Sequence, residues 1–296
     1  MVPPRPSAYQ AAVPSAADIP YDPGMLWPIE LASALILGLF LALMARGGLR
    51  SARPGRQSFS GILRDVGLIA ALAWCAEVLS IRLFGFYQYD APWLLFLDVM
   101  PALVALIWPF VILSARELAV HLGLESEGRP SAAAVFAIVL YDASLVEPVA
   151  VAARLWSWNE PGIFGVPPIG ILGWAFFAAA VSFLLDRAPR ALLLAPLLVQ
   201  GLLVAAWWGL FRWVLREAQD PTRLAAASAL VALILAIWVL RSGRRAPLAV
   251  MIPRMAAAAL FFVLLFLRGR EVSALIPYGA SFALPYLAAT RFKARS

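Results

Sequence analysis

The most regular feature of the chain is a series of long apolar runs separated by short polar or Gly/Pro-rich segments. Each run has 17 or more residues, about the length that an α-helix needs to cross a hydrocarbon core of about 30 Å. The pattern predicts an all-α, polytopic integral membrane helical bundle with eight or nine transmembrane helices. The runs are Met25–Met44, Val66–Leu83, Trp93–Leu113, Ala132–Leu155, Ile169–Leu185, Ala191–Leu215, Leu224–Leu240, Val250–Leu267 and Val272–Ala289.

The composition supports this class and explains the charge. The 296 residues are 63% hydrophobic and 14% charged, whereas soluble domains carry about 25% charged residues. The net charge of +7 comes from 24 Lys and Arg against 17 Asp and Glu. Because the basic residues lie between the apolar runs, membrane topology accounts for them, and nucleic acid is not a predicted partner. The positive-inside rule predicts a multi-pass protein of the cell (inner) membrane, with the N-terminus outside and the C-terminus in the cytoplasm.

The organisation outside the runs is simple. Residues 1–25 are rich in Pro and Ala and are predicted to be a disordered tail, and residues 26–296 form a single transmembrane domain. The single cysteine, Cys75, and the single histidine, His121, exclude an internal disulfide and a histidine-rich metal site. No phosphate-binding or dinucleotide-binding glycine motif occurs, so no bound cofactor and no metal are predicted. We expect His121 to be solvent-exposed in a cytoplasmic loop, and Arg254 to anchor its helix at the membrane interface.

The acids within the apolar runs include Glu77, Asp98, Asp142 and Glu147. An acid at the centre of a membrane helix costs about 2.5–3.5 kcal/mol on insertion scales, so such residues commonly serve a function. One interpretation is structural, with the acids bonding other helices or pairing with Arg82 and Arg154. The other is a proton-handling cluster, since a buried neutral acid can donate a proton. Asp142 and Glu147 are five residues apart and point about 140° apart on an ideal helix, so they do not form a simple pair.

The stretch Tyr141–Trp174 adds tryptophans to these acids. Trp156 and Trp158 end an apolar run, and a Gly/Pro-rich turn leads to Trp174 at the start of the next run. An interfacial aromatic belt accounts for Trp156 and Trp158. Trp108 and Trp174 lie further from the expected membrane faces, and aromatic ring faces can stabilise a positive charge.

Three motifs together resemble the carotenoid biosynthesis proteins that include carotenoid 1,2-hydratases (γ-carotene 1′-hydratase) and bisanhydrobacterioruberin hydratase. The resemblance covers about residues 60–290, and weaker similarities are Pro253-Arg254 and Leu284-Pro285-Tyr286. It departs from the family where Gly170 and Ile171 stand in place of Asn-Phe. The motifs are Glu77 followed by FGFYQY at Phe84–Tyr89, Asp142 and Glu147-Pro148 followed by Trp156-x-Trp158, and Phe164-Gly165-Val166-Pro167 leading to Gly173-Trp174.

The resemblance implies a cofactor-independent hydratase that adds water to the terminal C1=C2 double bond of an acyclic carotenoid end group. Asp142 or Glu147 would donate the proton, and Glu77 would orient the water. The substrate would come from the bilayer, so the expected partners are a lipophilic carotenoid, membrane lipids and other carotenoid-pathway enzymes. Two alternatives stay open, a carotenoid end-group (lycopene) cyclase and a non-catalytic membrane subunit or lipophile transporter. The expected substrate-binding residues are Tyr87, Tyr89, Trp108, Trp156, Trp158 and Trp174.

Overall fold

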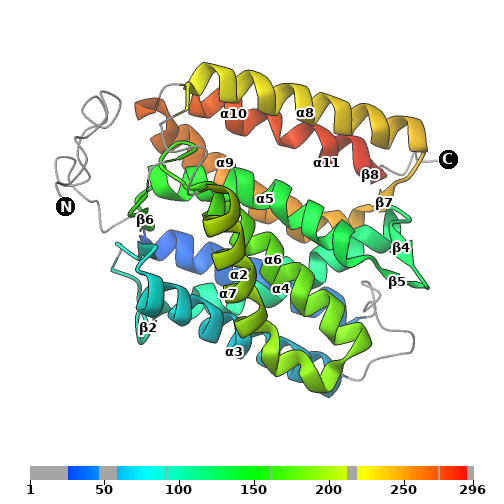
Figure 1. The fold of residues 1–296 in the computed structure, drawn as a ribbon. Coiled ribbons are helices and arrows are strands. Elements are labelled where there is room, and N and C mark those ends of the chain that lie inside the picture. The colour runs from blue at the N-terminus through cyan, green and yellow to red at the C-terminus, as the bar shows by residue number, and fades with distance from the viewer. Residues whose placement is uncertain are drawn as a thin grey trace.

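The computed structural model describes residues 26–46, 59–90, 92–160, 162–211, 219–272 and 274–291. Among these residues, eight helical segments are long and apolar enough to cross a membrane, which confirms the all-α, multi-pass fold (Figure 1). The predicted tail, residues 1–25, lies outside the described residues. The segments are α2 (Leu26–Ala45), α3 (Phe59–Phe84), α4 (Ala102–His121), α5 (Ala132–Ala152), α6 (Pro168–Arg187), α7 (Ala195–Ala206) with a 3₁₀ turn before it (Pro189–Leu194) and a π turn after it (Trp207–Phe211), α8 (Pro221–Ser242), and α9 (Leu248–Arg268) with a 3₁₀ turn after it (Gly269–Glu271).

The ninth predicted run forms two short helices, α10 (Leu275–Ser281) and α11 (Ala283–Ala289), which lie along α8 (Figure 1). Pro285 explains the break, because it has no N–H to donate to the carbonyl of Ser281 four residues earlier. The pair still returns the chain across the bundle. Strand β8 (Thr290–Arg291), which follows α11, pairs in parallel with β7 (Ala246–Pro247), which precedes α9.

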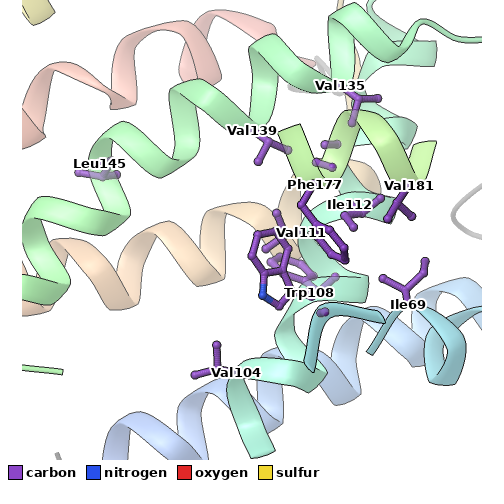
Figure 2. Close-up of a cluster of buried hydrophobic side chains, with 14 of the residues drawn as sticks. Ile69, Val104, Trp108, Val111, Ile112, Val135, Val139, Leu145, Phe177 and Val181 are labelled. Atoms are coloured by element: carbon purple, nitrogen blue, oxygen red, sulfur yellow. The ribbon is translucent and has the colours of Figure 1, made fainter. Parts of the chain in front are cut away.

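Helix α4 lies at the centre of the bundle and packs against α2, α3, α5, α6 and α9. Its apolar side chains form a cluster with those of α5 and α6, and in Figure 2 Trp108 lies beside Phe177 within it. The two rings meet edge to face with their centroids 4.9 Å apart. The central position of α4 matters because its neighbours α3 and α5 carry Glu77 and Glu147.

Short strand pairs close the two ends of the bundle. At one end, β1 (Tyr87–Gln88) pairs with β6 (Ser157–Trp158), and β2 (Phe96–Leu97) pairs with β3 (Met100–Pro101). At the other end lie the β7–β8 pair and the hairpin of β4 (Glu125–Ser126) with β5 (Arg129–Pro130) (Figure 1). We call these the β6 end and the β7 end. The β1–β6 pair joins the α3–α4 connection to the α5–α6 connection, which brings the motifs at residues 84–89 and 156–158 together.

Candidate active site

A small cavity at the β6 end collects the unusual residues of the sequence. Its volume is about 60 Å³, and it lies between α3, α4, α5, α6, α7 and the β1–β6 pair. We call it the acid cavity, because two carboxyl groups, those of Glu77 and Glu147, line it. Of the nine predicted site residues, Asp142 alone does not contribute to its wall. The aromatic residues in the wall include Tyr87, Tyr89, Trp108, Trp156, Trp158 and Trp174.

Glu147 is held by three tryptophans. Its side chain is 3% exposed. One carboxyl oxygen accepts hydrogen bonds from the indole Nε1 atoms of Trp156 and Trp158, both at 2.9 Å, and the other accepts one from Trp174 at 2.6 Å. Trp156 and Trp158 can both reach the same carboxyl group because residues i and i+2 of an extended segment point to the same side. An indole N–H only donates, so this environment supplies three donors to the carboxyl group and suits its negative form.

The helix that carries Glu147 contains a proline at the next residue, Pro148. A proline inside a helix leaves the carbonyl four residues earlier without its usual partner. Here that carbonyl belongs to Ser144, and the hydroxyl of Tyr278 donates to it at 2.8 Å. The bond joins α5 to α10 and satisfies a backbone group that hydrocarbon could not solvate.

Glu77, from α3, has fewer donors. The Trp108 indole donates to one carboxyl oxygen at 3.0 Å, and the Tyr89 hydroxyl lies 3.5 Å from the other, which is long for a hydrogen bond. Burial, with the nearby carboxyl groups, raises the pKa of Tyr89, so its hydroxyl stays protonated as a donor. Among the described residues, neither Glu77 nor Glu147 forms an ion pair with a basic side chain.

Two tryptophans connect the acids. The rings of Trp108, which donates to Glu77, and Trp174, which donates to Glu147, lie against each other with centroids 4.7 Å apart and a tilt of 40°. The structure therefore brings Glu77, Glu147 and the tryptophans together from separate helices and loops. The catalytic and substrate-binding roles of these residues stay predictions.

Asp142 lies elsewhere, in a network that joins α4, α5, α9 and α11. It bonds the guanidinium of Arg254 and the hydroxyl of Tyr286, and Arg254 also donates to Ser114 at 2.8 Å. Arg254 is 8% exposed. The prediction that it anchors at the interface is wrong, because α9 turns this residue toward the carboxylate of α5.

The remaining polar residues also have structural partners. Asp98 pairs with Arg82 at the surface, as the structural interpretation expected, and the guanidinium lowers the pKa of the Asp98 carboxyl. His121 is half-buried rather than solvent-exposed, since its ring lies against Glu117 on the preceding turn of α4. The part of the chain that the structure describes holds no cluster of three His, Cys, Asp or Glu side chains that could bind a metal ion.

Gly170 explains how Trp158 reaches Glu147. A Cβ atom built on Gly170 would lie 2.5 Å from Cζ2 of Trp158, so only a glycine lets the indole lie this close to α6. This position is one of the two where the sequence departs from the motif it resembles. No feature of the sequence showed that Trp158 would cover it, because the contact joins an extended loop to a helix.

We therefore expect Gly170→Ala to displace Trp158 and to lower the free energy of unfolding by about 1–3 kcal/mol, the usual cost of overpacking. Gly173→Ala is the matched control, because a Cβ there meets Leu203 at an ordinary 3.6 Å. Thermal unfolding of the purified variants in detergent measures the difference. Equal unfolding midpoints for the two variants would contradict this account.

Comparison with known proteins agrees with the class that the fold and site define, a polytopic membrane protein with two acids in one aromatic-lined cavity. The family model for carotenoid biosynthesis proteins matches residues 34–195, which is more than half of the chain. The chain belongs to this family. The matched region contains Glu77, Glu147 and every tryptophan that bonds them. No curated protein matches the sequence, and no solved structure matches it.

Proposed function

We propose that this protein hydrates the terminal C1=C2 double bond of an acyclic carotenoid end group, giving a tertiary alcohol. The observation that carries the proposal is the pair Glu77 and Glu147, a half-buried and a buried acid without a basic partner among the described residues, in one cavity lined by tryptophans. Family membership supports the coarser statement, a role in carotenoid biosynthesis. The acid pair and the tryptophans around it support the more specific statement, hydration of the C1=C2 double bond.

The first step is transfer of a proton to C2. Two negative charges in one buried cavity repel each other, so one carboxyl group of such a pair keeps its proton. Three indole donors stabilise a carboxylate at Glu147, while Glu77 has one short bond. We therefore assign the proton to Glu77 and the negative charge to Glu147. This assignment exchanges the roles expected from the sequence, and it leaves Asp142 out because Asp142 already neutralises Arg254.

Protonation at C2 breaks the double bond and leaves a tertiary cation at C1. The ring faces of Trp108 and Trp174 lie beside the two acids and can stabilise this charge, by about 2 kcal/mol or more for a desolvated cation–π contact. The negative charge of Glu147 attracts the same cation. A site of this kind needs no group beyond the side chains of the chain itself.

The last step is addition of water at C1. The acid cavity, at about 60 Å³, has room for a water molecule, which occupies about 30 Å³ in the liquid. Ser80 and Tyr87 add polar groups to its wall. Water attacks C1 and gives up a proton to Glu147, so the pair again holds one proton and the substrate has gained the elements of water. Room for water favours hydration over cyclisation, which uses none.

Expression in a lycopene-producing host tests the proposal. We expect a new 1-hydroxy carotenoid heavier by one water, and in ¹⁸O-labelled water the hydroxyl should carry the label. A new product of unchanged mass would identify a cyclase instead. Unchanged pigment, with the protein shown to be in the membrane, would mean that it does not act on this end group.

A further inference from the structure

A second and larger cavity lies beside the acid cavity. Its volume is about 320 Å³, and its wall comes from α2, α4, α5, α6, α9, α11 and neighbouring loops. We call it the chain cavity. Nearly all of its wall is apolar, and the main polar groups are those of the Arg254 network. The ion pair between Arg254 and Asp142 is neutral as a whole and bonded to Tyr286 and Ser114, so it presents little unpaired charge to an occupant.

The cavity is elongated along the bundle. On α5 its lining runs from Asp142 through Val146, and it continues to Leu155 and Trp156 beyond the helix end. On α9 it runs from Met251 to Leu264, thirteen residues apart, which is about 20 Å of helix. A space of this length suits a linear chain better than a compact ring system.

The two cavities meet at a shared wall. Val104, Trp108, Trp156 and Trp174 line both of them. The three indoles of this set are also the ones that bond Glu77 and Glu147 from that side. A chain lying in the larger cavity would therefore reach the acids at this junction and nowhere else along its described wall.

The chain cavity also reaches the lipid-facing surface. Two of its lining residues, Ala259 on α9 and Leu287 on α11, are exposed, Leu287 by 51%. The same two helices also expose larger apolar side chains, such as Val263 on α9 and Leu284 on α11. A lipophilic molecule could pass between α9 and α11 from the bilayer without crossing water.

We propose that the chain cavity binds the terminal part of one linear polyene, which enters between α9 and α11 and places its end at the tryptophan junction. The proposal rests on the proposed function and names the site of its substrate. A volume of about 320 Å³ lies within the range of small-molecule pockets, roughly 300–1,000 Å³, and takes one end of the chain, the remainder staying in the lipid. The acid cavity then holds the water molecule and the two carboxyl groups.

Two alanines of α9 offer a matched test. Ala258 lines the chain cavity, whereas Ala256, two residues earlier on the same helix, does not. Both are partly buried. Ala258→Phe should fill the cavity, and Ala256→Phe adds the same side chain outside it. Ala258→Leu is a milder variant in case the phenylalanine prevents folding.

The experiment measures polyene bound to purified protein in the Glu77→Gln background, where the substrate should bind without reacting. The protein is placed in lipid nanodiscs containing lycopene, re-isolated, and its polyene absorbance is divided by protein content. We expect at least a tenfold lower ratio for Ala258→Phe, and an intermediate one for Ala258→Leu, with the ratio for Ala256→Phe unchanged. Equal ratios for the Ala258 and Ala256 variants, or no bound lycopene in any of them, would overturn the proposal. Bound lycopene that depends on Ala258, together with a wild-type protein that forms no hydroxylated product, would support the chain cavity and reject the proposed function.

Discussion

Glu77→Gln should reduce hydration by about 10²–10⁴-fold, the usual contribution of a general acid. The amide oxygen of glutamine can still accept the hydrogen bond from Trp108, so the fold should survive while the transferable proton is lost. Conversion of lycopene in isolated membranes, normalised to protein content, measures the effect.

Glu160→Gln is the control for this result. Glu160 also accepts an indole hydrogen bond, from Trp207 at 3.0 Å, but it lies outside the acid cavity. We expect its replacement to leave conversion within about twofold of the wild type, because the half-buried Glu160 does not line the acid cavity and changes away from such features usually alter little. Full conversion by Glu77→Gln would remove Glu77 from the role of proton donor. Glu147→Gln should also be inactive. It separates a chemical effect from a structural one less well, because the amide NH₂ group would face the three indole donors.

Asp142→Asn should lower the free energy of unfolding by about 3–5 kcal/mol, the cost of leaving a buried charge without its partner. The stranded charge is that of Arg254, which is 8% exposed and lies between four helices. Unfolding in mixed detergent micelles, followed by circular dichroism, gives the difference from the wild type. The cause is a lost counter-ion rather than a lost catalytic group.

Two further variants separate those causes. Asp98→Asn breaks the surface pair with Arg82, and because that pair is exposed we expect little change in stability. The double replacement Asp142→Asn with Arg254→Gln removes both buried charges and should restore much of the stability lost in the single variant. If Asp142→Asn is as stable as Asp98→Asn yet makes no product, Asp142 has a catalytic role that our assignment denies it.

Most residues of the acid cavity, but not their partners, could be predicted from the sequence. Glu77, Glu147 and the tryptophans were predictable because acids and paired tryptophans are out of place in apolar runs, and because helices that alternate in direction bring their ends to the same side of a membrane. The place of Asp142 was not predictable from helix order alone. Its partner Arg254 lies 112 residues later, and nothing in the local pattern distinguishes an arginine that faces a neighbouring helix from one that reaches the interface.

The fold, too, could be predicted from the sequence only in part. Hydrophobic length correctly predicted every long helix, since burial in hydrocarbon leaves the backbone few alternatives to a helix. It did not show that the ninth run, which contains Pro277 and Pro285, breaks at Phe282, because membrane helices also tolerate prolines without ending. The two-residue strand pairs were also missed, since they are shorter than any periodic pattern.

The β1–β6 pair has a consequence for how such a site can change. Glu77 and Glu147 stand on α3 and α5, and each of these helices packs on α4. Close to the acids, the connection between them is a ladder of two residues on each side, Tyr87 with Trp158 and Gln88 with Ser157. The spacing of the acids thus depends on loop register at the rim of the bundle. An insertion or deletion in either loop would change the distance between the carboxyl groups of Glu77 and Glu147 without altering any transmembrane helix.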